Sequence, residues 1–347
     1  MFYRRILSLV LAFCLLFTLC ACSGSDNPAG LESSPQDSSQ EDPQIDLEQN
    51  PLTGEKNLSK DSYGKIPVAF TVNNADVAQK VQSGVGDADL VFETEVEGGI
   101  TRLLAVFADP SKIKTLGTIR SLRVVYADIA CGLDAFLVHH GIDPSYCAPH
   151  VKSIDLLRYN IDSPYAFREN NGLAVEHTLY TNSDKISKLI ADKKYEDKTS
   201  STIWANFTKE GETRTPSSVQ CLKLKVPFSS CSITNFTYNS EENKYVRENR
   251  KGVPFTDYKT GEKELFTNVF VLKTTMSYYP DNYHRDISLS GGRGYYISNG
   301  GIEEISWSKG DSSDSFKFTT ADGSKLEVNR GNSYVCIIND SREISFE

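Results

Sequence analysis

The chain has 347 residues, of which 24% are charged and 10% aromatic, and its formal net charge is −9. This length exceeds what one hydrophobic core usually takes, so more than one domain is expected. The excess of acidic residues provides no basic field for a nucleic-acid backbone, and no nucleic-acid partner is expected.

Residues 1–21 have the pattern of a lipoprotein signal peptide. Arg4-Arg5 precede an uncharged apolar run at 6–19, and Leu19-Cys20-Ala21-Cys22 has the form of a lipobox. The run is shorter than the roughly 20 apolar residues that span a bilayer, which disfavours the alternative of an uncleaved membrane helix. We predict cleavage before Cys22 and lipidation of its thiol, with acyl chains such as palmitate. The lipid would then anchor the chain in the cell membrane, facing outside.

Residues 22–50 are expected to form an acidic, disordered tether. Within 23–50 there are seven Asp and Glu residues but no Lys, Arg or aromatic residue. Such a segment cannot bury enough apolar surface to offset the entropy of ordering itself. Its negative charge is expected to repel anionic lipid headgroups and to hold the folded part away from the membrane.

The residues after the tether predict two domains, 51–205 and 206–347. The candidate boundary lies within 193–218, where Lys, Glu, Thr and Ser dominate. Before it, strand-like runs alternate with helix-like runs, and after it nearly everything has the pattern of strands and turns. We therefore expect an α+β fold with an N-terminal mixed sheet covered by helices and a mostly antiparallel C-terminal β domain.

A β-hairpin is predicted soon after an apolar strand at 66–72. Residues 90–97 alternate in character, and Gly98-Gly99 suits a two-residue turn because glycine adopts a positive φ at low cost. This turn places Glu95 opposite Arg102 on the returning strand. One face of the hairpin then belongs to the core, and the other face displays Glu93, Glu95, Glu97 and Arg102.

Two arginines further along the chain supply counter-charges for this hairpin. Three carboxylates spaced about 6 to 7 Å apart along a strand repel each other without such partners. Arg120 and Arg123 flank Ser121, the predicted N-cap of a helix whose apolar stripe begins at Leu122. We expect both arginines to fold over the glutamate face, and the alternative is a face that is simply solvated.

The remaining polar residues define neither a metal site nor a catalytic site. The sequence has no His-x-x-x-His, no paired Cys-x-x-Cys and no Asp-rich calcium loop, so we expect no metal and no other cofactor. Two glutamates at alternate positions also suggest a glycosidase pair, but an arginine opposite Glu95 would lower the pKa of that carboxyl and disfavour a general acid. Cys131 and Cys147 either form a disulfide or are small buried residues.

The second half carries turn signals between short β-rich runs. Asn299-Gly300 and Asp322-Gly323 are typical hairpin turns. Residues 334–338 would be the closing strand of a meandering antiparallel sheet. The aromatic residues here are expected in the core or in cross-strand pairs, with stacking on sugar rings as the alternative, at Tyr278, Tyr279, Tyr283, Tyr295, Tyr296 and Trp307.

A set of short motifs runs through most of the chain after the tether. In the first half they are Asn50-Pro51-Leu52-Thr53-Gly54, Val72-Asn73-Asn74, Gln82-Ser83-Gly84, Ala88 to Glu93, Val96 to Arg102 and Gly117 to Arg123. In the second half they are Tyr245-Val246-Arg247, Asn268 to Val271, Ile305 to Lys309 and Asp322-Gly323. Together they resemble the YerB-like lipoproteins of Gram-positive bacteria.

That resemblance implies an envelope lipoprotein, with a layered α and β N-terminal domain followed by a β-rich one. It implies no established reaction. The family often has a Pro-His-Asn element before a Leu-Tyr pair, whereas this chain has Val175 to Tyr180 there and matches the element only at His177.

We therefore predict a membrane-anchored extracytoplasmic binding or accessory protein of the cell envelope with a charged cleft. Arginines recognise carboxylates and phosphates, and glutamates accept hydrogen bonds, so peptidoglycan or an envelope protein is the expected partner. The alternatives are a cell-wall hydrolase with a glutamate as acid or base, and a structural protein with a buried Glu/Arg network. The expected ligand-binding residues are Glu93, Glu95, Glu97 and Arg102 as the floor, Arg120 and Arg123 as the wall, and Asn74 and His177 as outlying polar contacts.

Overall fold

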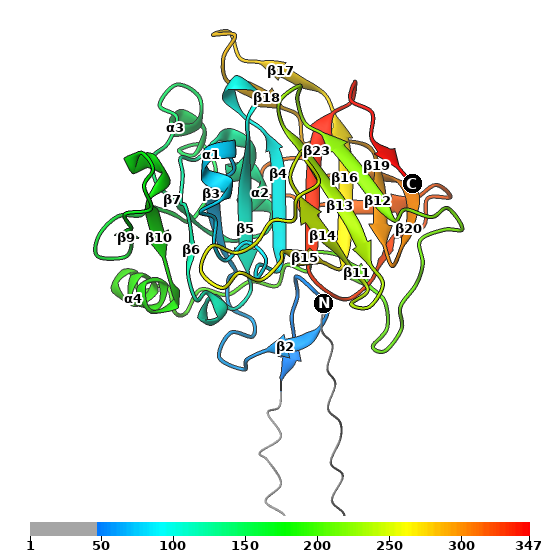
Figure 1. The fold of residues 1–347 in the computed structure, drawn as a ribbon. Coiled ribbons are helices and arrows are strands. Elements are labelled where there is room, and N and C mark those ends of the chain that lie inside the picture. Colours follow the sequence, from blue (N-terminus) through cyan, green and yellow to red (C-terminus); the bar gives the residue numbers. More distant parts are fainter. Residues whose placement is uncertain (1–46) are drawn as a thin grey trace, which may run out of the picture. The chain divides into compact units, whose positions relative to one another are not determined.

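Two β-sheets dominate the computed structural model, which describes residues 47–347 (Figure 1). The expected signal peptide, Cys22 and most of the tether lie outside these residues, so cleavage, lipidation and disorder stay predictions. Among residues 47–347, none of the helices is both long and apolar enough to cross a membrane.

The larger sheet joins strands from both halves of the sequence. Within residues 47–347 it comprises ten strands, whose spatial order is β21 (Lys317–Thr320), β20 (Gly301–Ser308), β19 (Gly291–Ser298), β16 (Asn268–Thr274), β23 (Ser333–Asn339), β4 (Leu90–Glu95), β5 (Thr101–Phe107), β3 (Val68–Asn73), β7 (Phe136–His139) and β8 (Arg158–Asn160). The expected boundary at 205 therefore lies between two stretches of sequence that contribute to one sheet.

Strand pairing within this sheet is mixed. β3, β7 and β8 run parallel to one another, whereas β4 and β3 both run antiparallel to β5. On the other side, β16, β19, β20 and β21 are antiparallel neighbours. The predicted α+β fold with a mixed N-terminal sheet is confirmed.

β23 lies in the interior of the large sheet, between β16 and β4, and runs parallel to both. The prediction that residues 334–338 close an antiparallel meander is therefore wrong. All of Tyr334–Ile338 is buried. A strand that is buried on both faces has an unbroken apolar run instead of an alternating one, and this run was the signal for an interior position.

The second sheet is antiparallel and packs over one face of the large sheet (Figure 1). Its strands are, in spatial order, β15 (Leu265–Phe266), β14 (Lys244–Glu248), β13 (Ile233–Asn239), β12 (Lys223–Pro227) and β24 (Ser345–Phe346). Phe236 and Phe266 of this sheet pack edge-on against Tyr334 of β23, with ring centroids 5.2 and 4.9 Å away. The expected antiparallel C-terminal β part is confirmed.

Helices pack on both faces of the large sheet. α2 (Val124–Gly132) shares a core with Phe92 of β4 and Leu104 of β5, and α4 (Ser183–Lys193) shares the opposite core with Phe70 of β3. The other two helices, α1 (Asp76–Gln79) and α3 (Cys147–His150), are one turn each. The described cysteines are free thiols, Cys131 and Cys147 included.

α2 begins later than the sequence suggested. Its N-cap is Arg123, which makes no side-chain capping bond, so the predicted cap at Ser121 is wrong. The residues before it stay extended because their backbone is used elsewhere: Arg120 N donates to Thr71 O at 2.9 Å and Leu122 N to Gly141 O at 3.0 Å.

The remaining elements are short. β1 (Glu48–Gln49) pairs with β2 (Lys56–Leu58), β10 (Leu179–Thr181) lies between β6 (Leu116–Gly117) and β9 (Phe167–Arg168), β11 (Asn206–Phe207) pairs with β22 (Glu327–Val328), and β17 (Met276–Tyr278) pairs with β18 (Arg285–Ile287). The 3₁₀ turns are η1 (Glu97–Gly99), η2 (Pro110–Lys112) and η3 (Val175–His177).

The predicted hairpin is present as β4 and β5, but its connection is longer than two residues. η1 forms the turn, and Val96 N donates to Ile100 O at 2.8 Å. Arg102 therefore pairs with Thr94 and not with Glu95. Because successive side chains of a strand point to opposite faces, this one-residue shift puts Arg102 and Glu93 on opposite faces of the sheet.

Candidate functional site

The segment 117–123 brings two arginines to the ends of the parallel strands. Ile119 forms a β-bridge with Val72 near the carboxyl end of β3. The backbone N–H of His140, just after β7, donates to Arg120 O at 3.0 Å. The segment therefore lies across the carboxyl ends of β3 and β7. In open α/β sheets, this edge is the common location of ligand sites.

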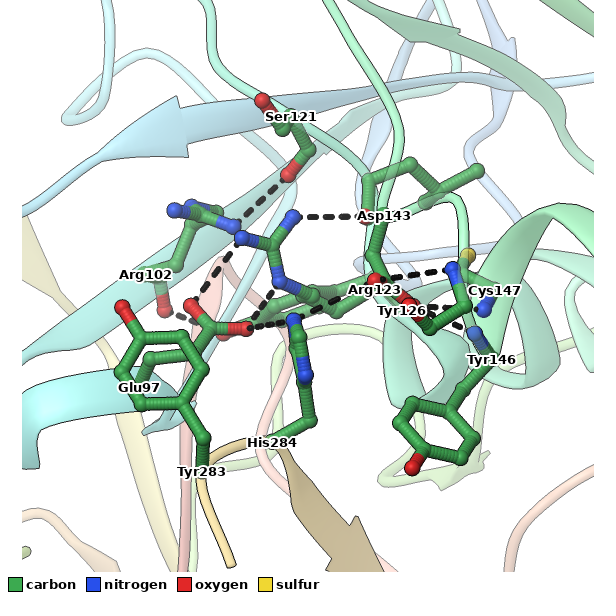
Figure 2. A network of polar contacts seen from close by, with 12 residues as sticks. Glu97, Arg102, Ser121, Arg123, Tyr126, Asp143, Tyr146, Cys147, Tyr283 and His284 are labelled. Atoms are coloured by element: carbon green, nitrogen blue, oxygen red, sulfur yellow. Dashed lines mark hydrogen bonds and ion pairs between the residues drawn. The ribbon is translucent and has the colours of Figure 1, made fainter. Parts of the chain in front are cut away.

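Arg102 and Arg123 meet around the carboxylate of Glu97 (Figure 2). Arg123 forms a two-pronged ion pair with Glu97, from Nε to Oε1 and from Nη2 to Oε2, the latter at 3.0 Å. Arg102 is only 4% exposed, and its Nη1 donates to Ser121 O at 2.8 Å. The hydroxyl of Tyr126, on α2, donates to the carbonyl of Arg102 and holds that strand in place.

Like charges crowd one another in this region. Burial, and then the charge of Arg123, lower the pKa of Arg102 to about 10. Burial also lowers the pKa of Arg120, and Arg123 contributes to that shift. Burial alone would raise the pKa of Glu97, but the Arg123 hydrogen bond and charge overcome this effect and lower it. Arg102 thus remains charged at neutral pH beside an ionised Glu97.

Arg120 is half-buried and lies near His177. Its Nη1 donates to Glu176 O at 3.0 Å, while its Nε is buried and has no hydrogen-bond partner among residues 47–347. Asn73 Nδ2 lies 2.7 Å from His177 Nδ1, so the neutral ring carries its proton on Nε2. Burial, and then the charge of Arg120, lower the pKa of His177. This end of the site therefore offers donors from Arg120 and His177, and the exposed Glu176 is the acidic side chain beside them.

Glu93 lies elsewhere, between the two sheets. It is 1% exposed and accepts hydrogen bonds from Asn74 Nδ2 at 2.8 Å and from Thr101 Oγ1 at 2.6 Å. Two further donors come from the C-terminal half, Thr234 Oγ1 at 2.8 Å and Tyr334 OH at 2.7 Å. Glu93 and Asn74 thus join the two halves of the chain instead of lining a cleft.

A buried arginine that the site prediction did not include completes this network. Arg247 on β14 is fully buried and donates from Nη1 to Glu264 Oε2 at 2.8 Å and from Nη2 to Asn74 Oδ1 at 2.8 Å. Its guanidinium lies 3.8 Å from the ring centre of Phe255. The motif Tyr245-Val246-Arg247 had pointed to this position, but nothing in the sequence marked Glu264 as its partner. A buried ion network, one of the alternatives, describes this part of the molecule.

Glu95 pairs with Arg285 on β18, not with Arg102 as the sequence predicted. Next to it, His284 Nε2 lies 3.2 Å from Asp143 Oδ1 and 3.8 Å from Glu97 Oε1. The cavity that these side chains leave has a volume of only about 10 Å³. The β17–β18 hairpin therefore covers the carboxylates on this side and leaves no room for a ligand.

The structure brings part of the predicted site together. Glu97, Arg102, Arg120, Arg123 and His177 lie in one region, which we call the arginine cluster. Glu93 and Asn74 belong to the network between the sheets, and Glu95 belongs to the β18 contact. The proposed common floor of three glutamates does not form. In the part of the chain that the structure describes, no group of three His, Cys, Asp or Glu residues is arranged to hold a metal ion.

The fold and this site define an α+β protein whose two halves share one sheet and whose N-terminal half carries an arginine cluster. The chain belongs to the family described as "Protein of unknown function (DUF3048)": its N-terminal domain model matches residues 52–196 and its C-terminal domain model matches residues 224–335.

A curated relative and a solved structure agree with this assignment. The chain is 30% identical to "Putative lipoprotein YerB" of Bacillus subtilis (strain 168) over 268 residues, which is 74% of this chain and 77% of that protein. It matches the crystal structure of YerB protein from Bacillus subtilis with a TM-score of 0.72 and 27% identity, covering 86% of this chain and 99% of that one. The resemblance to YerB-like lipoproteins is confirmed.

Proposed function

We propose that the chain is an outward-facing envelope lipoprotein, anchored through Cys22, that binds an anionic group of a cell-wall ligand at the arginine cluster. The lipobox-like sequence at 19–22 supports the anchor, as does the name of the Bacillus subtilis relative, which describes that protein as a lipoprotein. The arginine cluster supports the binding role.

The crowding of three guanidinium groups around one buried carboxylate carries the proposal. Arg123 pairs with Glu97, the buried Arg102 is close enough to feel both charges, and Arg120 adds a third positive charge, which the exposed Glu176 and Glu97 offset in part. The Arg120 side chain is half-buried, and within residues 47–347 its guanidinium makes one hydrogen bond, from Nη1 to Glu176 O. A carboxylate or phosphate next to Arg120 would relieve the repulsion and form charge-assisted hydrogen bonds.

Neither Glu93 nor Glu97 suits the role of general acid in the hydrolase alternative. The carboxylate of Glu93 is occupied by four donors, and the lowered pKa of Glu97 keeps it ionised, whereas a general acid must hold a proton. A binding role needs only the fixed positive charges that the arginine cluster supplies.

The proposal is tested by cosedimentation of the full-length protein, in detergent, with purified Gram-positive cell-wall sacculi. Arg120→Gln removes the half-buried charge without breaking an ion pair, and we expect at least about tenfold weaker binding with an unchanged melting temperature. Arg342→Gln, which removes an arginine charge near the C-terminus, is the matched control and should bind normally. Equal binding by wild type and Arg120→Gln would refute the proposal.

The source of the anion is found by treating the sacculi with hydrofluoric acid, which removes phosphodiester-linked polymers. Binding that survives this treatment assigns the anion to a carboxylate of the peptidoglycan peptides. Binding that is lost assigns it to a wall-polymer phosphate.

A further inference from the structure

Part of the large sheet has no covering layer on one face. On β20, the exposed Glu304 and Ser306 alternate with the buried Ile305 and Trp307. Ile305 and Trp307 face the core that contains α2. Glu304 and Ser306 therefore lie on the opposite face of the large sheet, which is the face that the five-stranded sheet covers in its other part. Ile297 and Ile302, on this same face, are buried in the core shared with the second sheet. Within residues 47–347, the second sheet therefore covers one end of β19 and β20 and leaves the other end, around Glu304 and Ser306, open to solvent.

Two adjoining hollows open on this face, with volumes of about 800 and 440 Å³, and the larger one also extends to Arg214 and Glu303 on the opposite face of β20. Tyr295 of β19 and Glu304 of β20 line both hollows, and the two residues are direct cross-strand partners. The walls of the larger hollow include Val219, Phe346 of β24 and the turn at 320–325. We call the two hollows, with the Tyr295–Glu304 pair between them, the sheet-face groove.

The lining of the sheet-face groove combines apolar surface with balanced charge. Val219 and Phe346 are 50% and 43% exposed, and Tyr295 is half-buried. The basic residues are Arg214, Lys273, Arg293 and Lys325, and the acidic residues are Glu303, Glu304, Asp322, Glu327 and Asp340. Near-equal numbers of opposite charges favour neither a polyanion nor a polycation, but they provide many donors and acceptors for hydroxyl and amide groups.

The floor of the groove offers side chains and only short pieces of free backbone edge. β19 and β20 pair with each other along their whole length, β19 pairs with β16 at Gly294–Ser298, and β20 pairs with β21 at Ile305–Ser308. Ile302 N also donates to Val219 O at 3.1 Å, so the open main chain is confined to Gly291–Arg293 and Glu303–Glu304. An extended peptide usually binds by adding a strand to an open edge of several residues, and neither stretch provides one. A sugar chain needs no such edge, because its rings pack on aromatic faces and its hydroxyls bond to polar side chains.

We propose that the sheet-face groove binds a glycan chain of uncharged sugars, with a sugar ring on the face of Tyr295 and its hydroxyls bonded to Glu304 and neighbouring polar residues. This site is separate from the arginine cluster and does not depend on it. Each of its two hollows has a volume in the range of ligand sites, which is about 300 to 1,000 Å³.

Calorimetric titration of the full-length protein in detergent with chitohexaose, an uncharged oligomer of N-acetylglucosamine, tests the proposal. We expect saturable binding that Tyr295→Ala weakens about tenfold, because the stacking face is lost, and that Tyr295→Phe preserves. Tyr63→Ala is the matched control, since Tyr63 is 56% exposed and does not line the groove. Glu304→Ala should also weaken chitohexaose binding. Because Glu304 is exposed, this variant is expected to fold, and it tests the proposal if Tyr295→Ala fails to fold.

Three results would overturn this proposal. They are the absence of saturable chitohexaose binding, chitohexaose binding that neither groove variant weakens, and groove variants that instead abolish binding of a peptidoglycan stem peptide. Arg120→Gln should leave chitohexaose binding unchanged. A failure of the glycan site is therefore distinguishable from a failure of the anion site.

Discussion

His139 ends β7 with its imidazole fully buried. Its Nδ1 donates to Gly141 O at 2.7 Å, which leaves Nε2 as the acceptor facing Arg158 Nη1 at 3.4 Å. Burial lowers the pKa of His139 to about 4. An unfolded histidine titrates near 6.5, so the native state binds fewer protons than the unfolded state between pH 4 and 6.5. The contribution of His139 to stability is therefore complete above pH 6.5 and is lost as the pH falls toward 4.

We predict that His139→Gln flattens the acid limb of the stability curve. Between pH 6.5 and 4, wild type should lose about 3 kcal/mol more unfolding free energy than the variant, as measured by urea denaturation. Asp89 provides a control of opposite sign, because burial raises its pKa to about 6 and its protonation stabilises the native state as the pH falls from 6 to 3.8. Asp89→Asn should therefore steepen the acid loss. Parallel curves for wild type and His139→Gln would contradict the assignment.

The residues of the arginine cluster were predictable in part. Arg123 and Glu97 carry opposite charges at positions where the sequence already suggested a contact, and they pair. The strand partner of Arg102 could not be predicted correctly, because the Gly98-Gly99 pair does not reveal that the turn already begins at Glu97. A shift of one residue in the pairing register then moves a side chain to the other face of the sheet. Arg285 reaches Glu95 from 190 positions away, and no local pattern marks such a contact.

At the scale of single elements, the β17–β18 hairpin is held against the N-terminal half by a few strong contacts. Tyr279 in its loop stacks on Tyr146 with ring centroids 4.1 Å apart and an interplanar angle of 10°. Arg285 pairs with Glu95, whose side chain is 5% exposed. The sequence predicted hairpins from Asn-Gly and Asp-Gly turns but gave no sign of this one, since its connection contains neither dipeptide.

We predict that Arg285→Ala destabilises the protein by about 3 kcal/mol, because it leaves the buried carboxylate of Glu95 unpaired. Adding Glu95→Gln should restore a large part of that loss, since the uncompensated charge is then removed. Lys188→Ala breaks the exposed pair with Asp192 on α4 and should change stability little. Urea denaturation at pH 7 measures all four proteins. A similar loss for Arg285→Ala and Lys188→Ala would show that the Glu95 contact is not energetically special.

At the scale of the whole molecule, the pairing of β4 with β23 joins residues 51–205 to residues 206–347, which the sequence had suggested to be separate domains. The kinds of secondary structure in each half were predictable, because the hydrophobic periodicity that indicates them is a local property of the sequence. The joining was not, because it depends on which strand lies beside β4, and the partner lies more than 200 residues further along. Glu93 and Arg247 show the same limit for side chains, since the polar network between the sheets draws on both halves of the chain.

This continuity predicts that neither half folds alone. Residues 51–205 without β23 would expose the edge of β4, and they would lose the cover over Glu93 that Thr234 and Tyr334 provide. We expect this fragment to give a poorly dispersed amide NMR spectrum, and we expect mixing with separately produced 206–347 to restore native dispersion. Thermal unfolding of the whole chain should accordingly follow one cooperative transition. A well-dispersed spectrum from the isolated N-terminal fragment would show that β4 needs no partner, and that the shared sheet contributes little to the stability of the N-terminal half.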